Sequence, residues 1–141
     1  MENKATQVTV TTTVNANVEK VWKNWSTPAD IIKWCSPSEE WHTPRAENDL
    51  RAGGKFLSRM EAKDGSMGFD LTGVYDEVNM HELITYTMAD GRKVKVAFTA
   101  NGNETAIEET FDAEDQNPVE MQRLGWQAIL DSFKKYTEGN N

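Results

Sequence analysis

One long amphipathic segment near the C-terminus limits what this chain can fold into. From Pro118 to Tyr136, apolar residues such as Met121, Leu124 and Phe133 recur at helical spacing over about five turns. A single helix with so wide an apolar stripe must bury that stripe against another layer of structure. We therefore expect a sheet elsewhere in the chain, with this helix packed on one of its faces.

The residues before this helix carry the pattern of antiparallel strands. Residues 7–14 alternate between Val and Thr on opposite faces, which favours a strand with one face buried. Further alternating stretches are separated by Asp-Gly and Asn-Gly turn signals, at spacings typical of an antiparallel meander. The expected strands cover residues 7–14, 42–50, 55–62, 68–78, 83–88, 93–99 and 105–111.

Between the first two expected strands the hydrophobic period changes to that of a helix. Asn17 is a candidate N-cap, and apolar residues follow at helical spacing from Val18 to Trp25. Pro28 suits the first turn of a second short helix, which should run to Trp34. The expected order is one strand, two short helices, several antiparallel strands and one long helix, which is an α+β fold.

Charge and cysteine content exclude several classes of protein. The formal net charge of −8 argues against a nucleic-acid partner and against binding to anionic membrane surfaces. No apolar run approaches the roughly 20 residues that span a bilayer, and residues 1–10 lack the apolar region of a secretory signal. The one cysteine, Cys35, cannot form an intramolecular disulfide. We expect a cytoplasmic protein that does not insert into membranes.

Three local strings carry a resemblance to a known family. They are residues 16–22 with Thr27-Pro28 and Trp34, the hairpin of residues 49–56 with its paired glycines, and Gly125-Trp126 in the final helix. These strings resemble the START-like (SRPBCC) superfamily, which has the helix-grip fold of the birch-pollen allergen. Within that superfamily the chain is most similar to homologues of the activator of the ninety-kilodalton heat-shock-protein ATPase.

The resemblance implies one domain over residues 1–141, with an ordered core of about residues 7–137. It implies about seven antiparallel strands wrapped around the C-terminal helix, with a cavity between them. Members of the superfamily bind hydrophobic small molecules, lipids or polyketides; some cyclise or hydrolyse them, and some bind a chaperone. The fold alone does not select among these functions, and both a monomer and a homodimer stay open.

Strand alternation, taken with the resemblance, predicts which side chains face the cavity. If Phe56 points inward, so does Met60, and the final helix should present Trp126 and Ile129 opposite them. Each of these side chains would serve equally well in a packed core. The residues predicted to bind the ligand are Trp34, Trp41, Phe56, Met60, Phe69, Tyr75, Tyr86, Met88, Phe98, Glu109, Gln122, Trp126 and Ile129.

Glu109 is the position of greatest chemical interest. Its neighbours at two-residue spacing, Ile107 and Phe111, are apolar, so alternation puts a carboxyl group on the inner face of the sheet. Buried without a partner, that group would cost several kcal/mol or take up a proton. It could then orient a ligand, or act as a general base beside Tyr75 or Tyr86. Alternatively, it is solvated at the open end of the sheet or paired with a Lys or Arg.

No motif for a metal, a cofactor or nucleophilic catalysis stands out. His42 and His81 are far apart in the sequence, and Gly53-Gly54 is typical of a hairpin turn and not of a phosphate-binding loop. Trp34 and Trp41 flank a loop between helix and strand, and these two side chains would gate the cavity, contact a partner or cap the core. We predict non-catalytic binding of a small hydrophobic molecule, lipid-like or aromatic, without cofactor or metal. The alternatives are a cyclase or hydrolase with Glu109 as base, and a co-regulator that binds a heat-shock chaperone.

Overall fold

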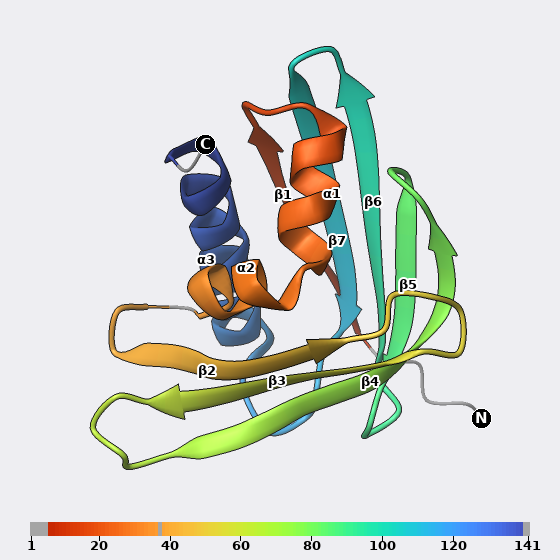
Figure 1. Ribbon diagram of the computed structural model, residues 1–141. Helices are drawn as coiled ribbons and strands as arrows, with labels where there is room; N and C mark the ends of the chain where they lie inside the picture. Colours follow the sequence, from red (N-terminus) through yellow and green to blue (C-terminus); the bar gives the residue numbers. More distant parts are fainter. Residues whose placement is uncertain (1–5, 37, 140–141) are drawn as a thin grey trace, which may run out of the picture.

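A seven-stranded antiparallel sheet curls around the C-terminal helix (Figure 1). The computed structural model describes residues 6–36 and 38–139. The α+β class and the expected order of elements are confirmed. The strands are β1 (Gln7–Val14), β2 (Trp41–Asn48), β3 (Lys55–Ala62), β4 (Gly68–Asn79), β5 (Leu83–Met88), β6 (Lys93–Asn101) and β7 (Glu104–Asp112); the helices are α1 (Val18–Ser26), α2 (Pro28–Trp34) and α3 (Val119–Gly139).

The strand order β1-β7-β6-β5-β4-β3-β2 makes a meander of β2 to β7, with β1 added beside β7. The connection from β1 to β2 therefore crosses from one edge of the sheet to the other, and it carries α1 and α2 across the inner face (Figure 1). The pairing of β4 with β5 shifts register between Tyr75 and Glu77, an irregularity of the kind that bends a strand. Such a bend lets the sheet wrap around α3 on more than one side.

Both short helices begin where the sequence predicts. Asn17 has an extended backbone, and its Oδ1 accepts a hydrogen bond from the Lys20 amide at 2.9 Å, which caps α1. Pro28 opens α2, where a missing N–H leaves no hydrogen bond unmade. The Asp-Gly turns end in Gly65 and Gly91, whose φ values of 79° and 95° suit glycine. Local sequence thus determines how these elements start and turn.

The packed core lies between the inner face of β1, β6 and β7 and the helices α1 and α3. Val10, Val96 and Phe111 are at most 2% exposed on these strands. On the helical side, the ring of Phe133 lies 4.9 Å from the rings of both Trp25 and Trp34, measured between centroids. This cluster ties all three helices together over one half of the sheet.

The limits of four strands differ from the sequence prediction, and β4 differs least, since it ends at Asn79 instead of residue 78. β2 covers Trp41–Asn48 instead of residues 42–50, and its register shifts between His42 and Arg45, next to Pro44, which has no N–H for the ladder. β6 and β7 extend to a pair between Asn101 and Glu104, because the turn between them is tight. No helix in residues 6–36 and 38–139 is long and apolar enough to cross a membrane.

Candidate functional site

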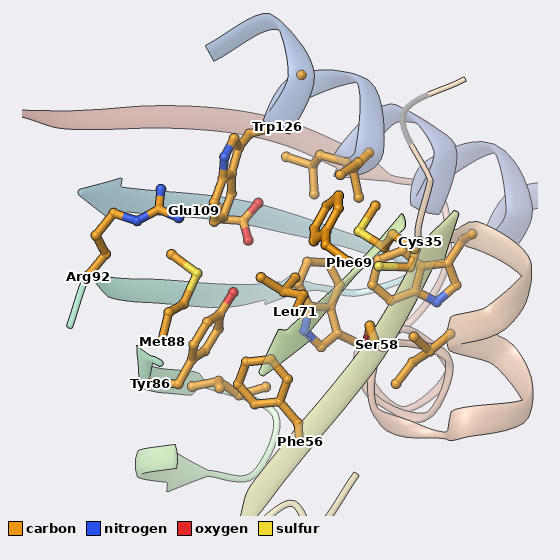
Figure 2. A pocket seen from close by; sticks show the side chains of 18 of the residues that line it. Cys35, Phe56, Ser58, Phe69, Leu71, Tyr86, Met88, Arg92, Glu109 and Trp126 are labelled. Carbon is orange, nitrogen blue, oxygen red and sulfur yellow. The ribbon is translucent and has the colours of Figure 1, made fainter. Parts of the chain in front are cut away.

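A cavity of about 420 Å³ lies between the inner face of the sheet and α3 (Figure 2). Strands β3, β4, β5 and β7, the C-terminal end of α2 and one face of α3 supply its walls. Phe69 and Met121 line the cavity and are also 45% and 57% exposed, so they lie at its mouth. Of the predicted residues, those that line it are Trp34, Phe56, Met60, Phe69, Tyr75, Tyr86, Met88, Glu109, Gln122, Trp126 and Ile129.

The two other predicted residues, Phe98 and Trp41, do not line this cavity. Phe98 lies in the packed core, with its ring centroid 5.3 Å from Trp22 and 5.6 Å from Trp25. Trp41 starts β2 and contacts Phe69 at 6.1 Å between centroids, and it lines a separate open hollow. Alternation places Phe98 on the correct face, but the covering helix residues fill the space in front of it. The expectation that both residues line the cavity is corrected accordingly.

Glu109 lies on the inner face of β7 and is only 6% exposed. Within the part of the chain that the structure describes, its carboxyl group has no hydrogen-bond or ion-pair partner. Every fully enclosed side-chain nitrogen or oxygen among those residues does have a partner, so the Glu109 oxygens must reach the cavity. Figure 2 shows the carboxyl group pointing into it. Of the sequence alternatives, an ion-paired Glu109 does not match this arrangement.

The electrostatics of Glu109 follow from its burial. Desolvation raises the pKa of its carboxyl group from the ordinary 4.5 to about 8. At neutral pH the group therefore holds its proton, and it can donate a hydrogen bond as well as accept one. A carboxylic acid in this state is a neutral polar group in an apolar wall.

Two cavity tyrosines, which pair across β4 and β5, use their hydroxyl groups differently. Tyr75 donates to Asn48 Oδ1 at 2.5 Å, and Asn48 in turn donates to the carbonyl oxygen of Ser26 at 2.6 Å. The hydroxyl group of Tyr86 has no partner among the residues described, and it points into the cavity (Figure 2). Burial raises the pKa of both phenols well above the usual range. The Tyr75 hydroxyl thus stabilises the fold through its bond to Asn48, whereas the Tyr86 hydroxyl is available to a ligand.

Cys35 is buried in the cavity wall at the end of α2. Burial raises the pKa of its thiol to about 12, with a smaller opposing effect of a hydrogen bond with Ser58. Thr43 donates to the Cys35 carbonyl oxygen at 2.5 Å and holds this end of the helix. Because the thiolate is the reactive form of cysteine, Cys35 is a poor nucleophile here.

Gln122 lines the cavity, but its amide is already used by the segment that precedes α3. Its Oε1 accepts from the Glu114 amide at 2.8 Å. Its Nε2 donates to the carbonyl oxygens of Glu114 at 3.0 Å and Asn117 at 2.8 Å. Gln122 therefore fixes the loop that closes one end of the cavity.

Arg92 lines the cavity and was not predicted from the sequence. Its Nε donates to Asp90 Oδ2 at 2.8 Å, within the turn between β5 and β6. A turn residue carries no periodic signal, so alternation could not find it. No group of three or more His, Cys, Asp or Glu side chains in the described ranges is arranged to hold a metal ion.

Comparisons with known proteins agree with this architecture. A family model described as Activator of Hsp90 ATPase homolog 1-like protein matches residues 15–138. The AHSA1-like protein from Aeromonas hydrophila is 40% identical, with a TM-score of 0.89 over 95% of this chain and 93% of that one. Chr148 from Cytophaga hutchinsonii is 59% identical, with a TM-score of 0.82 over the same shares.

A more distant structure shows the fold alone. The Aha1 dimer from Colwellia psychrerythraea is 14% identical, with a TM-score of 0.74 over 96% of this chain and 99% of that one. A search of curated proteins gave no significant match. The helix-grip arrangement is therefore shared at very low sequence identity.

Proposed function

Since the chain belongs to the family of Activator of Hsp90 ATPase homolog 1-like proteins, a branch of the START-like helix-grip superfamily, we propose that it binds a small hydrophobic molecule between the sheet and α3. Membership in this family is consistent with a ligand-binding or a co-chaperone-like domain. The cavity of about 420 Å³ is the observation that carries the proposal. Its size falls within the usual range for small-molecule sites, whereas packed cores contain few voids larger than a water molecule.

The chemistry of the wall supports an apolar ligand. Phe56, Trp126 and Ile129 offer broad apolar surfaces, and Met60 and Met88 can adjust to the shape of a ligand. Few polar groups face the cavity, and those of Tyr75 and Gln122 already bond to the protein. The predicted residues that line the cavity are the proposed ligand contacts.

We propose binding without catalysis, because the candidate reactive groups are not arranged as a catalytic pair. The raised pKa of Cys35 keeps the thiol protonated. Glu109 has no hydrogen-bonded group among the described residues to orient it as a base. A general base works best when a second group fixes its geometry.

Gly125 provides a direct test, because it lines the cavity and an ideal Cβ at this position meets no atom within 4 Å. Gly125→Leu should project an isobutyl group into the cavity. N-phenyl-1-naphthylamine, a neutral apolar fluorophore, should bind the unmodified protein saturably with increased emission, and the variant should lose this binding.

Gly139→Leu is the matched control, since it adds the same side chain at the exposed end of the same helix, where an ideal Cβ also meets no atom. This control should bind the fluorophore as the unmodified protein does. Unchanged binding in Gly125→Leu, or no saturable binding in the unmodified protein, would contradict a ligand in the cavity.

The description of the family favours a second candidate function, a co-regulator of a heat-shock chaperone. Such a partner would contact the outer surface, so Gly125→Leu should leave its binding intact. Isothermal titration with an Hsp90-class chaperone tests this. The absence of binding at micromolar concentrations would count against the second candidate without affecting the first.

A further inference from the structure

On the strands that line the cavity, two hydrogen-bonding side-chain groups lack a partner within residues 6–36 and 38–139. They are the carboxyl group of Glu109 and the hydroxyl group of Tyr86. By contrast, the polar groups of Tyr75 and Gln122, which also line the cavity, bond to the protein. Because polar groups inside proteins are nearly always paired, these two groups point to a partner that comes from outside the chain.

The sheet register brings these two groups together. β6 lies between β5 and β7, and its Val96 pairs with Ile84 on one side and with Glu109 on the other. Tyr86 is two residues from Ile84, so it shares the inner face with Glu109. At the positions between them, β6 presents two apolar side chains, Val94 and Val96, to this face. Figure 2 shows the phenol and the carboxyl group directed into the same part of the cavity.

We propose that Glu109 and Tyr86 are a pair of hydrogen-bond donors that recognises one neutral acceptor oxygen, such as a ketone or ester carbonyl, on an otherwise apolar ligand. This inference rests on the proposed function of the cavity. A neutral carboxylic acid beside a tyrosine hydroxyl is an arrangement that can hold a carbonyl oxygen. An acceptor oxygen satisfies both donors at once, whereas a hydrocarbon leaves both without a partner and removes them from water.

The charges around the cavity argue against ionic ligands. Arg92, which lines the cavity, donates from Nε to Asp90, and its charge also interacts with the carboxylate of Glu114, which lines the cavity as well. A ligand anion would compete with these two carboxylates for the guanidinium group. A ligand ammonium would require an ionised Glu109, and burial opposes that charge.

The pH dependence follows from one group. The raised pKa of Glu109, about 8, lies within a titration from pH 6.5 to 9. Burial holds the pKa of Cys35 and of Tyr86 above that range, and hydrogen bonds from Asn117 lower that of Glu114. Loss of carbonyl affinity over this range therefore reports ionisation of Glu109. The titratable or charged groups that line the cavity from other elements are Cys35, Glu47, Tyr75, Tyr86, Arg92 and Glu114.

Three ligands of one skeleton test the proposal by calorimetric titration of the intact protein: tetralin, α-tetralone and 1-aminotetralin. The informative quantity is the ratio of the tetralin Kd to the α-tetralone Kd. Tyr86→Phe and Glu109→Met should each lower this ratio by about threefold to tenfold, the range expected for one hydrogen bond. Glu109→Gln still donates a hydrogen bond, so it should keep the ratio at pH 7 and abolish its decline towards pH 9.

A matched control separates loss of the hydrogen bond from structural damage. Glu108→Gln changes the exposed carboxylate next to Glu109, which lies outside the cavity. This control should keep the ratio of the unmodified protein. Thermal unfolding of each variant shows that the protein titrated is folded.

The outcomes are distinguishable. If tetralin and α-tetralone bind with a ratio that Tyr86→Phe and Glu109→Met leave unchanged, the donor pair is wrong and the binding cavity stands. Preference for 1-aminotetralin that strengthens as pH rises from 6.5 to 8 would overturn the inference in favour of an ammonium site. If no member of the series binds saturably, the inference falls together with a cavity for ligands of this size.

Discussion

Strands β1, β6 and β7 present most of their inner face to packed side chains, whereas β3, β4 and much of β5 present theirs to the cavity. Val10 and Ile107 on the packed half are 2% and 1% exposed. Phe56 and Leu71 on the other half are only partly buried, although they alternate along their strands in the same way. Glu109 lies on β7, a strand of the packed half, yet it lines the cavity, and it is the one unpartnered carboxyl group that does so among the residues described.

The difference comes from the covering layer and not from the strands. Trp22 and Trp25 of α1 and Phe133 of α3 fill the space above the packed half. Over the other half, α3 presents Gly125, which has no side chain to fill the volume. The cavity therefore depends on where the helices carry large side chains. Substitutions in the packed half and in the cavity half should differ in their effects on stability and on ligand binding.

The largest expected effect is on the packed half. Phe133 is fully buried between Trp25 and Trp34, so Phe133→Ala should lower the free energy of unfolding by about 3–5 kcal/mol. Phe56→Ala should cost about half as much, because it enlarges a space that is already open. Urea denaturation measures both values. Equal losses would mean that the two halves are packed alike.

Glu109, a carboxyl group of the packed half that reaches the cavity, should make stability depend on pH. In the unfolded chain its carboxyl group ionises near the ordinary pKa of 4.5, whereas in the folded protein it holds its proton up to a pKa of about 8. The folded state binds more protons between these values, so the free energy of unfolding falls as pH rises through this window.

Glu109→Gln should remove that dependence. We expect it to stabilise the protein by about 2–4 kcal/mol at pH 8, relative to its effect at pH 4.5, where the carboxyl group is protonated in the fold. Denaturation at several pH values gives the difference, with Glu108→Gln as control, since that carboxylate is exposed. Parallel pH profiles for the unmodified protein and Glu109→Gln would show that Glu109 is not buried as a neutral acid.

Local signals were sufficient to predict most of the fold. The Val and Thr alternation predicted β1 with its observed limits, and Asn17 predicted the start of α1. The ends of β6 and β7 could not be predicted, because ladder pairing continues to Asn101 and Glu104 beyond the residues that favour strands. Pairing between strands, and not the propensity of single residues, determines where a strand stops.

The site was predicted less completely, for a related reason. Alternation placed both Phe56 and Phe98 on the inner face, yet only Phe56 lines the cavity. Alternation also placed Glu109 inward. Whether its carboxyl group has a partner, however, depends on residues that are far apart in the sequence, which alternation does not show. The period of a strand shows which way a side chain points, and the opposing layer decides what it meets.

Gly73 allows a test of packing in the cavity half. An ideal Cβ there would lie 2.6 Å from Cε2 of Phe56 and 2.7 Å from the Thr87 carbonyl oxygen. Gly73→Ala should therefore lower the free energy of unfolding by about 1–3 kcal/mol and displace Phe56 towards the cavity. Weaker binding of N-phenyl-1-naphthylamine should accompany the loss. A stable variant with unchanged binding would show that the ring of Phe56 has room elsewhere.

Gly125→Ala should change the free energy of unfolding least, and it should raise it where the other substitutions in Phe133, Phe56 and Gly73 lower it. Glycine within a helix is less favourable than alanine by about 1 kcal/mol, and an ideal Cβ at Gly125 meets no atom within 4 Å. Gly125→Ala should therefore raise the free energy of unfolding by about 0.5–1 kcal/mol while it narrows the cavity by one methyl group. Urea denaturation and fluorophore titration measure the two effects separately. A higher free energy of unfolding together with weaker fluorophore binding would indicate that glycine at this position keeps the cavity open at a cost in stability. A lower free energy of unfolding would mean that the space next to Gly125 is already occupied.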